Sequence, residues 1–373
     1  MTASAGPSLD HERSLQVLPE RVEAARGSIT RSLALAADLG RAVPLPGSGR
    51  TAVTWQFLST IAAIDLSVAR VVEPHLDALA ILDQAAEADR EAVVPVVPAG
   101  ELSADHHPAG RNLAGARSTG TFGVFAAEAP GMSLTAASGA DGQWNLTGTK
   151  PWCSLADQLD RAIVTAHVGD GERRAFAVDL RGAGVMPEPA SGWVSRGLPE
   201  ITSCSVRFEA APATPVGDTN WYLRRDGFAW GGIGVAACWY GGAVGVARTL
   251  VAASAARTPD QIALLHLGRV DVALHDARTV LTDAADAVDS GSASGQEGAL
   301  LAARVRATVF RTAELVLEAA AHGLGPAPLA FDDHHAARVA DLHLYLRQHH
   351  AERDDAALGQ RVINRFQQGG SSW

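Results

Sequence analysis

The chain contains 373 residues, of which 47% are hydrophobic and 19% are charged, and its formal net charge is −10. This length allows two or three domains around a large buried core, and the composition is that of a globular protein rich in helix-forming alanine and leucine. The negative charge and the scattered arginines argue against a nucleic-acid partner, because phosphate binding requires clustered Lys and Arg.

The cysteine content and the first residues predict a cytoplasmic protein. The three cysteines, Cys153, Cys204 and Cys238, are widely spaced and odd in number, as expected for reduced thiols. Residues 1–13 contain neither a basic start nor an apolar run, so we predict no export signal there.

We predict an N-terminal helical domain over residues 1–116. Apolar residues recur every three or four positions from 11 to 39, which is the pattern of an amphipathic helix. A segment rich in proline and glycine interrupts this pattern. Two further helices are predicted at about 51–68 and about 74–88, the second because Glu73-Pro74 is typical of a helix start.

Residues 117–218 are predicted to form a small central β-barrel. Here short apolar segments alternate with turn residues, which is typical of an all-β domain. The predicted strands are 122–127, 143–147, 162–167, 175–179 and 203–208, and the predicted turns are 141–142, 169–171 and 182–184.

The helical pattern returns over residues 219–373, which we predict to form a four-helix bundle. The apolar stretch 231–246 is shorter than the roughly 20 residues that a bilayer requires. It also contains several glycines, so we interpret it as a buried helix and predict no membrane span. The predicted helices are 222–256, 260–288, 296–322 and 334–349. The expected fold class is therefore α+β.

The motif with the clearest chemistry is Gly-Thr-Lys-Pro-Trp-Cys-Ser at 148–154. On an extended segment, the Trp152 indole can cover one face of a planar redox ring while the Ser154 hydroxyl bonds to the polar edge of that ring. Such a pair suits a flavin. The alternative is that Trp152 is an aromatic residue of the barrel core, where large rings are common. Alternation of side chains along a strand would turn Cys153 away from the ring.

The order of helices, small barrel and helical bundle resembles the acyl-CoA dehydrogenase superfamily of flavoproteins over nearly the whole chain. Residues 125–133 are similar to the family's segment around Thr-Glu-Pro-Gly-x-Gly-Ser-Asp, with Glu128 on its Glu and Ser133 on its Ser. Residues 148–154 are similar to its Gly-x-Lys-x-Trp-Ile-Thr motif.

The resemblance implies that FAD is the cofactor and that specific residues contact it. Trp152 would lie against the isoalloxazine, and Ser154 would hydrogen-bond the N5 and O4 edge of that ring. Ser133 would touch the pyrophosphate. Ala126 and Ala127 would lie beside the flavin, but Ala127 replaces a threonine of the family, so only a backbone contact remains possible there.

Three further positions of the resemblance lie in the predicted bundle. Arg257 stands at the family's pyrophosphate-binding arginine, although Thr-Pro follows it here instead of Phe-Gly. Gly323 and Gly325 match the Gly-Gly-x-Gly turn that approaches the FAD of a neighbouring subunit, and glycine permits such an approach. Turn glycines are also common between helices for structural reasons alone.

The family's catalytic carboxylate is missing from both positions at which the resemblance expects it. If Asp341 matches the family's aspartate, His349 occupies the place of the catalytic glutamate, and the alternative place falls on the glycines 231–232. Glu352 lies one turn beyond, where a shifted register would bring it in. An imidazole with an ordinary pKa of about 6.5 can accept a proton at neutral pH, so His349 is the candidate base. The alternative is an exposed His349-His350 pair in a polar tail.

Two other patterns invite functional interpretations that we do not favour. The Gly-x-Gly-x-x-Ala pattern at 232–237 lacks the preceding strand and the following acidic residue of a dinucleotide-binding motif, so helix packing is the better interpretation. The His and Asp residues over 332–350 include no compact pair that closes a metal site, so we predict no metal.

These observations lead to three functional hypotheses. The first is an FAD-dependent oxidoreductase of the acyl-CoA dehydrogenase type, which acts on a small-molecule substrate of the acyl-CoA kind and assembles as a homo- or hetero-oligomer, by resemblance a tetramer. The second is a two-component flavin-dependent monooxygenase with His349 as base. Such monooxygenases of the same superfamily tend to carry a histidine in this helix. The third is a non-catalytic partner subunit that completes the FAD site of a neighbour.

Overall fold

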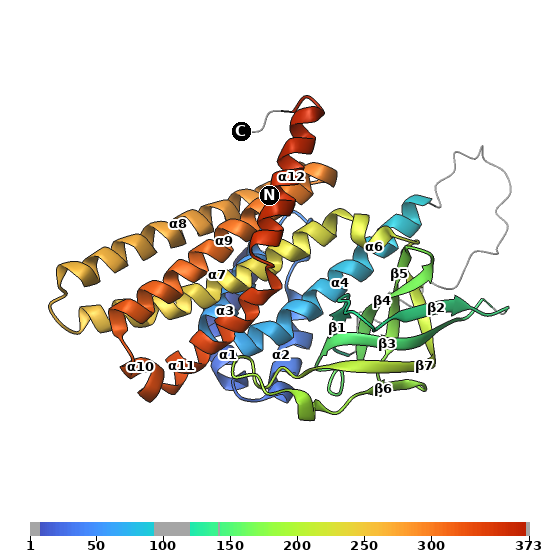
Figure 1. Cartoon of the computed structure of the whole chain (residues 1–373), viewed down its shortest axis with the longest axis horizontal. Coiled ribbons are helices and arrows are strands. Elements are labelled where there is room, and N and C mark those ends of the chain that lie inside the picture. The colour runs from blue at the N-terminus through green and yellow to red at the C-terminus, as the bar shows by residue number, and fades with distance from the viewer. Residues whose placement is uncertain (1–7, 93–119, 141, 371–373) are drawn as a thin grey trace, which may run out of the picture.

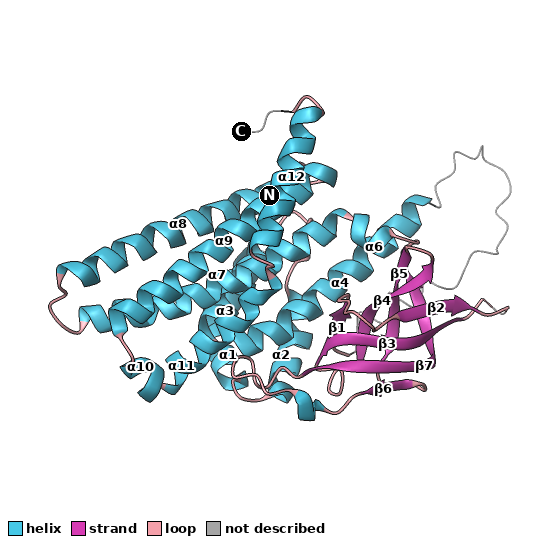
Figure 2. Cartoon of the chain, viewed as in Figure 1, coloured by secondary structure: helices cyan, strands magenta, loops and turns pink. Residues whose placement is uncertain are grey.

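The computed structural model describes residues 8–92, 120–140 and 142–370. Figure 1 shows a β-barrel on one side of the molecule, long C-terminal helices on the other side, and N-terminal helices packed between them. Figure 2 shows that the strands are confined to the barrel and that all other elements are helical. The fold is thus mixed α+β, with a small closed barrel and a C-terminal helical region, as the sequence predicts.

The N-terminal part consists of α1 (Ser8–Ala25), α2 (Ile29–Ala42), α3 (Thr51–Ile64) and α4 (Leu66–Ala92). The prediction of a single helix over 11–39 is therefore wrong. The chain turns at Gly27, whose φ of +66° suits glycine, and the Ser28 side chain caps α2 by accepting a hydrogen bond from the Arg31 backbone N–H. The apolar stripe itself is correct, since leucines of both helices are buried in the common core.

The predicted helix start at Glu73-Pro74 is also wrong. The helix α4 begins at Leu66, because the Asp65 carboxylate caps it by accepting a hydrogen bond of 2.8 Å from the Val68 backbone N–H. Pro74 lies inside α4. A proline within a helix loses one backbone hydrogen bond, and here the packing of α4 between the barrel and the neighbouring helices outweighs that loss.

The barrel strands are β2 (Leu134–Ser138), β3 (Trp144–Ser154), β4 (Arg161–Gly169), β5 (Glu172–Asp179) and β7 (Ser203–Val216). They pair in the order β4-β2-β3-β7-β5, and the pairing of β5 with β4 closes the barrel. In addition, β1 (Phe122–Phe125) runs parallel to β4, and β6 (Val185–Pro187) pairs antiparallel with β7. The sequence pattern does not predict β2, a short strand with only two buried residues. Residue 141 of a predicted turn lies outside the described residues.

The C-terminal helices are α6 (Trp221–Arg224), α7 (Asp226–Ala255), α8 (Gln261–Asp289), α9 (Gly295–Leu324), α10 (Ala327–Phe331), α11 (Asp333–Tyr345) and α12 (Glu352–Gln367). The first three predicted bundle helices correspond to α7, α8 and α9. The boundary predicted after residue 218 falls in the turn between β7 and α6, and the one after residue 116 lies outside the described residues. The domain division stays a prediction.

The fourth predicted helix, 334–349, is too long. The helix α11 ends at Tyr345, a 3-10 turn spans Leu346–Gln348, and His349 has extended backbone with φ −96° and ψ 127°. The polar tail that follows is itself a helix, α12, which buries none of its residues. The sequence analysis assigns no helix to this segment, because charged and polar residues dominate it.

The helix α7 is the central helix of the bundle. By length and composition alone it could cross a membrane, but 61% of its most apolar window is buried inside the protein. A Cβ added at Gly241 would lie 2.2 Å from the Ser59 carbonyl oxygen, and one at Gly245 would lie 2.7 Å from the Ala63 carbonyl oxygen. Glycine therefore allows α7 to pack directly on the backbone of α3. The Gly-x-Gly-x-x-Ala pattern at 232–237 lies within this helix.

His75 joins α4 to the barrel and makes the stability of the fold depend on pH. Its ring is buried, and its Nδ1 accepts a hydrogen bond of 3.2 Å from the Phe122 backbone N–H on β1. Burial, assisted by the positive charge of Arg41, lowers the pKa of His75 from 6.5 to about 4. As the pH falls, the unfolded chain therefore binds this proton before the folded protein does, so stability is lost between pH 6.5 and about 4.

We expect His75→Asn to reduce that loss of stability by about 3 kcal/mol, because asparagine keeps a hydrogen-bond acceptor without a titrating ring. Urea unfolding of both proteins at neutral pH and near the folded pKa of His75 measures the difference. Equal changes of unfolding free energy with pH in the two proteins would show that His75 is not the responsible group.

Candidate active site

A cleft of about 680 Å³ lies between the barrel and the helices α4, α7 and α11. This volume is within the range of roughly 300–1,000 Å³ that is usual for small-molecule and cofactor sites. Ala126, Ala127, Trp152 and Ser154 lie in its barrel wall. Four of the predicted cofactor-binding residues are thus brought together in one cleft.

The two predicted motifs are neighbours in the barrel. The strands β2 and β3 pair antiparallel, with Leu134 opposite Gly148. Gly148 has a φ of +123°, and a Cβ there would lie 2.2 Å from the Ser133 carbonyl oxygen, so only glycine fits. The Thr149 backbone N–H donates to the same oxygen at 2.8 Å. The glycine that begins the second motif therefore holds it against the end of the first.

Trp152 has an uncommon backbone conformation in the cleft wall. Its φ is +58°, and it lies at a register shift between Lys150 and Cys153 in the pairing of β3 with β7. Positive φ values are rare for residues other than glycine and are concentrated at functional sites. The Trp152 side chain lines the cleft and is 59% exposed, whereas Cys153 is buried. The alternative that Trp152 belongs to the barrel core is therefore wrong.

A line of polar contacts leads from Ser154 into the helical wall of the cleft. The Ser154 hydroxyl lies 2.8 Å from the Ser203 hydroxyl and accepts a hydrogen bond of 3.5 Å from Arg70. Arg70 forms an ion pair of 3.3 Å with Glu73. The Tyr345 hydroxyl donates to Glu73 at 3.4 Å. The barrel hydroxyl is thus connected through one guanidinium to a buried carboxyl.

Glu73 and Asp77 lie one turn apart on α4, and both line the cleft. Burial raises the pKa of Glu73 from 4.5 to about 7, against the opposing effect of Arg70. Burial also raises the pKa of Asp77, against the opposing effect of Arg225, whose guanidinium lies 3.7 Å away. A carboxyl with a pKa near neutrality can both donate and accept a proton under ordinary conditions.

Neither carboxyl is identified as a site residue by the sequence pattern, in which Glu73 serves only as part of an expected helix start. The signal that was available is a pair of acids four residues apart within a mostly apolar part of α4. Gly231, one of the positions at which the resemblance expects a catalytic carboxylate, faces Asp77, because a Cβ there would lie 2.8 Å from Asp77 Oδ1.

His349 does not line the cleft, although its neighbour His350 does. Its ring is buried and stacks on Phe310 with the ring centroids 4.2 Å apart, and Trp239 meets it edge-on. The His349 Nδ1 accepts a hydrogen bond of 3.1 Å from the Ala351 backbone N–H, and burial lowers the pKa of His349. Of the expected exposed histidine pair, only His350 is exposed. The role of His349 as a base stays a prediction.

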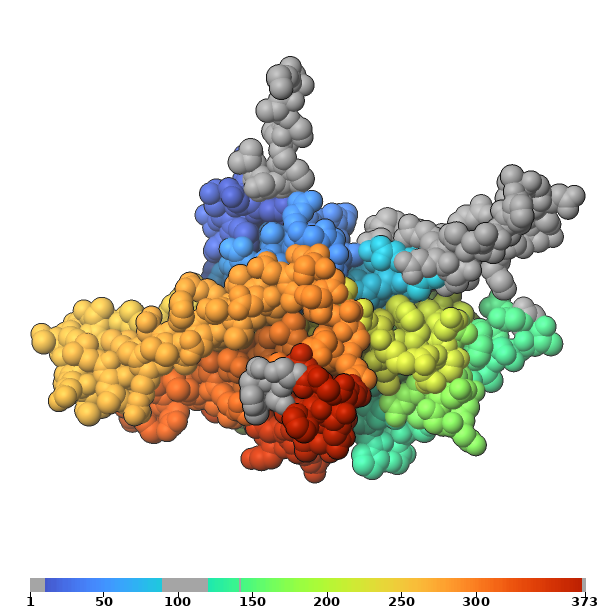
Figure 3. Space-filling view, turned by 90° about the horizontal axis from the view of Figure 1, so that it is seen from above, coloured from blue at the N-terminus to red at the C-terminus, as the bar shows by residue number. Residues whose placement is uncertain are grey.

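The remaining predicted cofactor residues are not part of this cleft. Ser133 is exposed next to β2, and Arg257 is exposed in the loop between α7 and α8. Gly323 and Gly325 lie at the end of α9. Figures 1 and 3 show that the ends of α7 and α9 and the start of α8 form a tip that projects away from the barrel. Arg257, Gly323 and Gly325 are therefore far from the cleft of their own chain.

No family model and no curated protein matches this sequence. Solved structures match nearly its whole length. KijD3 in complex with FMN and a dTDP-linked amino keto sugar has a TM-score of 0.77 at 18% identity, covering 99% of this chain and 95% of KijD3. FMN-bound TdsC from Paenibacillus sp. A11-2 has a TM-score of 0.75 at 16% identity, covering 95% of this chain and 98% of TdsC.

A nitrososynthase from Micromonospora carbonacea var. africana has a TM-score of 0.66 at 18% identity, covering 91% of this chain and 89% of that protein. This chain has the fold of these proteins. Its helices, small closed barrel and C-terminal helical region are consistent with the acyl-CoA dehydrogenase-like fold expected from the sequence.

Proposed function

We propose that this protein is a flavin-dependent oxidoreductase that acts on a small molecule in the cleft between the barrel and the helices. The observation that carries this proposal is that the Trp152 ring and the Ser154 hydroxyl line the same cleft. An aromatic ring suits one face of a flavin, and a hydroxyl suits its polar edge. The FMN in the structures of KijD3 and TdsC, which share the fold, supports a flavin in this chain.

The residues of the cleft fit an isoalloxazine ring. The exposed indole of Trp152 offers an apolar face, and the small side chains of Ala126 and Ala127 leave room beside it. The Ser154 hydroxyl can donate to the ring while it accepts from Arg70. A bound flavin supplies the hydride and electron transfer. The chain itself orients the ring, shields one of its faces from water and offers a carboxyl, Glu73, on the opposite wall.

Whether the bound flavin is FMN or FAD depends on a second subunit in this proposal. The ring contacts come from one chain, so FMN can bind to a single copy. The adenylate half of FAD would use Arg257, Gly323 and Gly325 at the far tip of another copy, in the homo- or hetero-oligomer, by resemblance a tetramer, that the sequence predicts. Exposed apolar side chains on α8 support such an assembly, because exposed apolar patches commonly mark subunit interfaces. These side chains are Ile262, Leu264, Leu265 and Val272.

Oxygenation is the reaction that we favour, with reduced flavin supplied by a separate reductase. This choice is supported by the shared fold of TdsC, a dibenzothiophene monooxygenase, and of the nitrososynthase. Dehydrogenation of an acyl-CoA-type substrate is the second candidate. Glu73 favours it, because removal of an α-proton from a thioester requires a positioned base such as a carboxylate.

A visible spectrum of the purified protein, followed by titration with FMN and with FAD, tests the proposal. We expect saturable flavin binding, and oxygen uptake with small-molecule substrates only when a flavin reductase and reduced nicotinamide are present. Anaerobic bleaching of the flavin by an acyl-CoA would establish the dehydrogenase instead. Flavin uptake only beside a different subunit would favour a non-catalytic partner subunit. Binding of neither flavin, at any oligomeric state measured by light scattering, would refute the proposal.

A further inference from the structure

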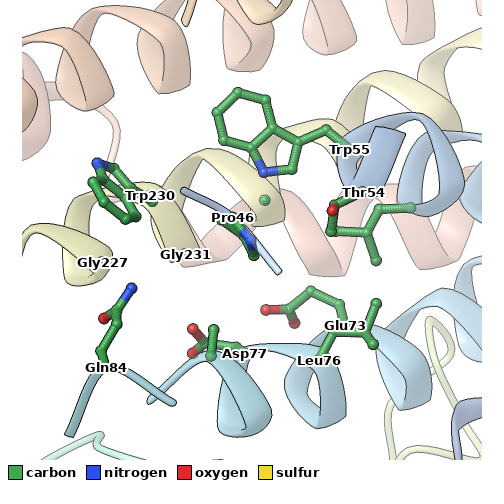
Figure 4. A pocket seen from close by; sticks show the side chains of 13 residues that line it. Pro46, Thr54, Trp55, Glu73, Leu76, Asp77, Gln84, Gly227, Trp230 and Gly231 are labelled. Atoms are coloured by element: carbon green, nitrogen blue, oxygen red, sulfur yellow. The ribbon is translucent and has the colours of Figure 1, made fainter. Parts of the chain in front are cut away.

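Two carboxyls of α4 face two separate spaces. Glu73 and Asp77 line the cleft, and both also line a second cavity of about 30 Å³ that α3 and α7 close from the other side. Figure 4 shows the two carboxylates in this second cavity, which we call the inner cavity, with Trp55 of α3 above them and Trp230 of α7 beside them. The pair therefore connects the cleft with an interior space.

The inner cavity has the size and the polar partners that a water molecule needs. A water requires about 10–15 Å³ of accessible space and two to four hydrogen-bonding groups. The buried Trp55 Nε1–H has no partner within the part of the chain that the structure describes. It faces the inner cavity, and the Glu73 carboxylate lies on the opposite side of that cavity (Figure 4). Gln84 and Asp77 add further polar groups. A water in the inner cavity would therefore join Trp55 to the carboxyls.

The groups around Glu73 and Asp77 have opposing effects on the pKa of Glu73. Near neutral pH, neither the protonated nor the ionised form of Glu73 is strongly preferred. The titratable and charged groups that face the two carboxyls are Arg70 on α4, Tyr222 on α6, Arg225 at the start of α7, Cys238 on α7, Arg306 on α9 and Tyr345 on α11. Burial and the like charge of Asp77 raise the pKa of Glu73, whereas Arg70, Tyr345 and Arg306 lower it.

We propose that Glu73 is the proton-exchanging residue of the cleft, and that Asp77 and the inner cavity return the proton that Glu73 loses. The Glu73 carboxyl gives its proton to a basic atom of the reactant bound in the cleft, and it regains one from water through Asp77. The exchange moves protons only, and each proton lost to the cleft is replaced from bulk solvent by way of the inner cavity and Asp77. This role rests on the proposed function, because it needs a reactant whose protonation changes.

The contacts of Glu73 place this exchange beside the predicted edge of the flavin. Arg70 bridges the Ser154 hydroxyl and the Glu73 carboxylate, at 3.5 Å and 3.3 Å. Arg70 also lies over the Tyr345 ring, 5.6 Å from its centroid, and the Tyr345 hydroxyl donates to Glu73. Arg70 and Tyr345 are therefore positioning residues, which hold the carboxyl between the two spaces.

The first test needs no flavin. Infrared difference spectra of the full-length protein between acidic and alkaline pH should contain the band of a protonated carboxyl that disappears with a midpoint near neutrality. In Glu73→Gln the component of this band with a midpoint near neutrality should be lost, while Asp341, whose pKa burial raises to about 6, keeps its own component. The Glu73 component should remain in Glu209→Gln, a matched control that changes an exposed carboxylate on β7, paired with Arg207 at 2.9 Å. A band that persists unchanged in Glu73→Gln would overturn the proposal.

Two further variants should move the midpoint in opposite directions. Asp77→Asn removes a like charge and should lower the pKa of Glu73, whereas Tyr345→Phe removes a hydrogen bond to the carboxylate and should raise it. These shifts test the proposal even if Glu73→Gln does not fold. An identical midpoint in both variants would overturn it.

The second test uses the flavin-loaded protein. The rate at which oxygen reoxidises the bound, reduced flavin should show an inflection near neutral pH. Glu73→Gln should lower this rate by about 100-fold, the lower end of typical general acid–base contributions, and abolish the inflection while the flavin still binds. If Glu73 has only a structural role, the pH profile of Glu73→Gln will keep its inflection. That result would overturn the proposal. If no flavin binds, the proposed function fails, and the infrared titration still decides whether Glu73 exchanges its proton.

Discussion

Replacing Trp152 with alanine is expected to weaken flavin binding by about fivefold to 150-fold, because stacking of a planar ring on an aromatic side chain is worth about 1–3 kcal/mol. The indole is 59% exposed and lines the cleft, so its removal leaves the buried core of the barrel intact. Titration of the purified variant with FMN, followed by absorbance or flavin fluorescence, gives the dissociation constant directly.

Two variants serve as controls for this result. Trp152→Phe keeps an aromatic face and should retain most of the affinity. Phe331→Ala removes a ring that is 90% exposed on α10, away from the cleft, and should leave the affinity unchanged. The same dissociation constant for Trp152→Ala and for the unaltered protein would contradict the placement of the flavin against this residue.

Replacing Trp239 with alanine is expected to lower the free energy of unfolding by about 3–5 kcal/mol, because it removes a large ring from a close-packed core. Trp239 lies on α7 and is fully buried. Its ring meets Tyr345 and His349 edge-on, and the Arg306 guanidinium lies 4.7 Å from its centroid. Arg306 in turn donates to the Gln348 carbonyl at 3.0 Å. The cavity would therefore form where α7 supports the wall of the cleft.

Urea unfolding measures this loss of stability. Val251→Ala is the matched control, since Val251 lies on the same helix but is 51% exposed, and its truncation should change the unfolding free energy by no more than about 0.5 kcal/mol. A loss below about 1 kcal/mol in Trp239→Ala would mean that the contacts of Trp239 do not hold α7, α9 and the turn before His349 together.

The large-scale architecture could be predicted because it depends on local periodicity. Spacings of three and four mark the helices, and short alternating segments with turn residues mark the barrel. The errors occurred where a single residue decides where a helix begins or ends. Gly27 divides the first predicted helix, and the Asp65 cap starts α4 before Pro74. The 3-10 turn before His349 ends α11 early.

The candidate site was predictable only in its barrel half. Trp152 and Ser154 belong to one short motif, and the structure places both in the cleft. The helical half was missed, because its chemistry arises from contacts between distant parts of the chain. Glu73 receives its hydrogen bond from Tyr345, 272 residues later, and its connection to Ser154 spans the gap between α4 and β3. No spacing within the sequence encodes such a contact.

The residue pattern alone was sufficient to determine two features: the order of helices, barrel and C-terminal helices, and the indole and hydroxyl at the end of β3. Each depends on interactions within a few residues or between adjacent strands. Packing of α4 between the barrel and α7 decided which of the other candidate residues are buried and which lie near the cleft. It buried Glu73 and Asp77 between two spaces, it placed His349 in an aromatic cluster beside the cleft, and it left Arg257 and Gly325 at the distant tip. Burial and charge depend on which distant elements meet, so the protonation chemistry of the site is a property of the tertiary structure.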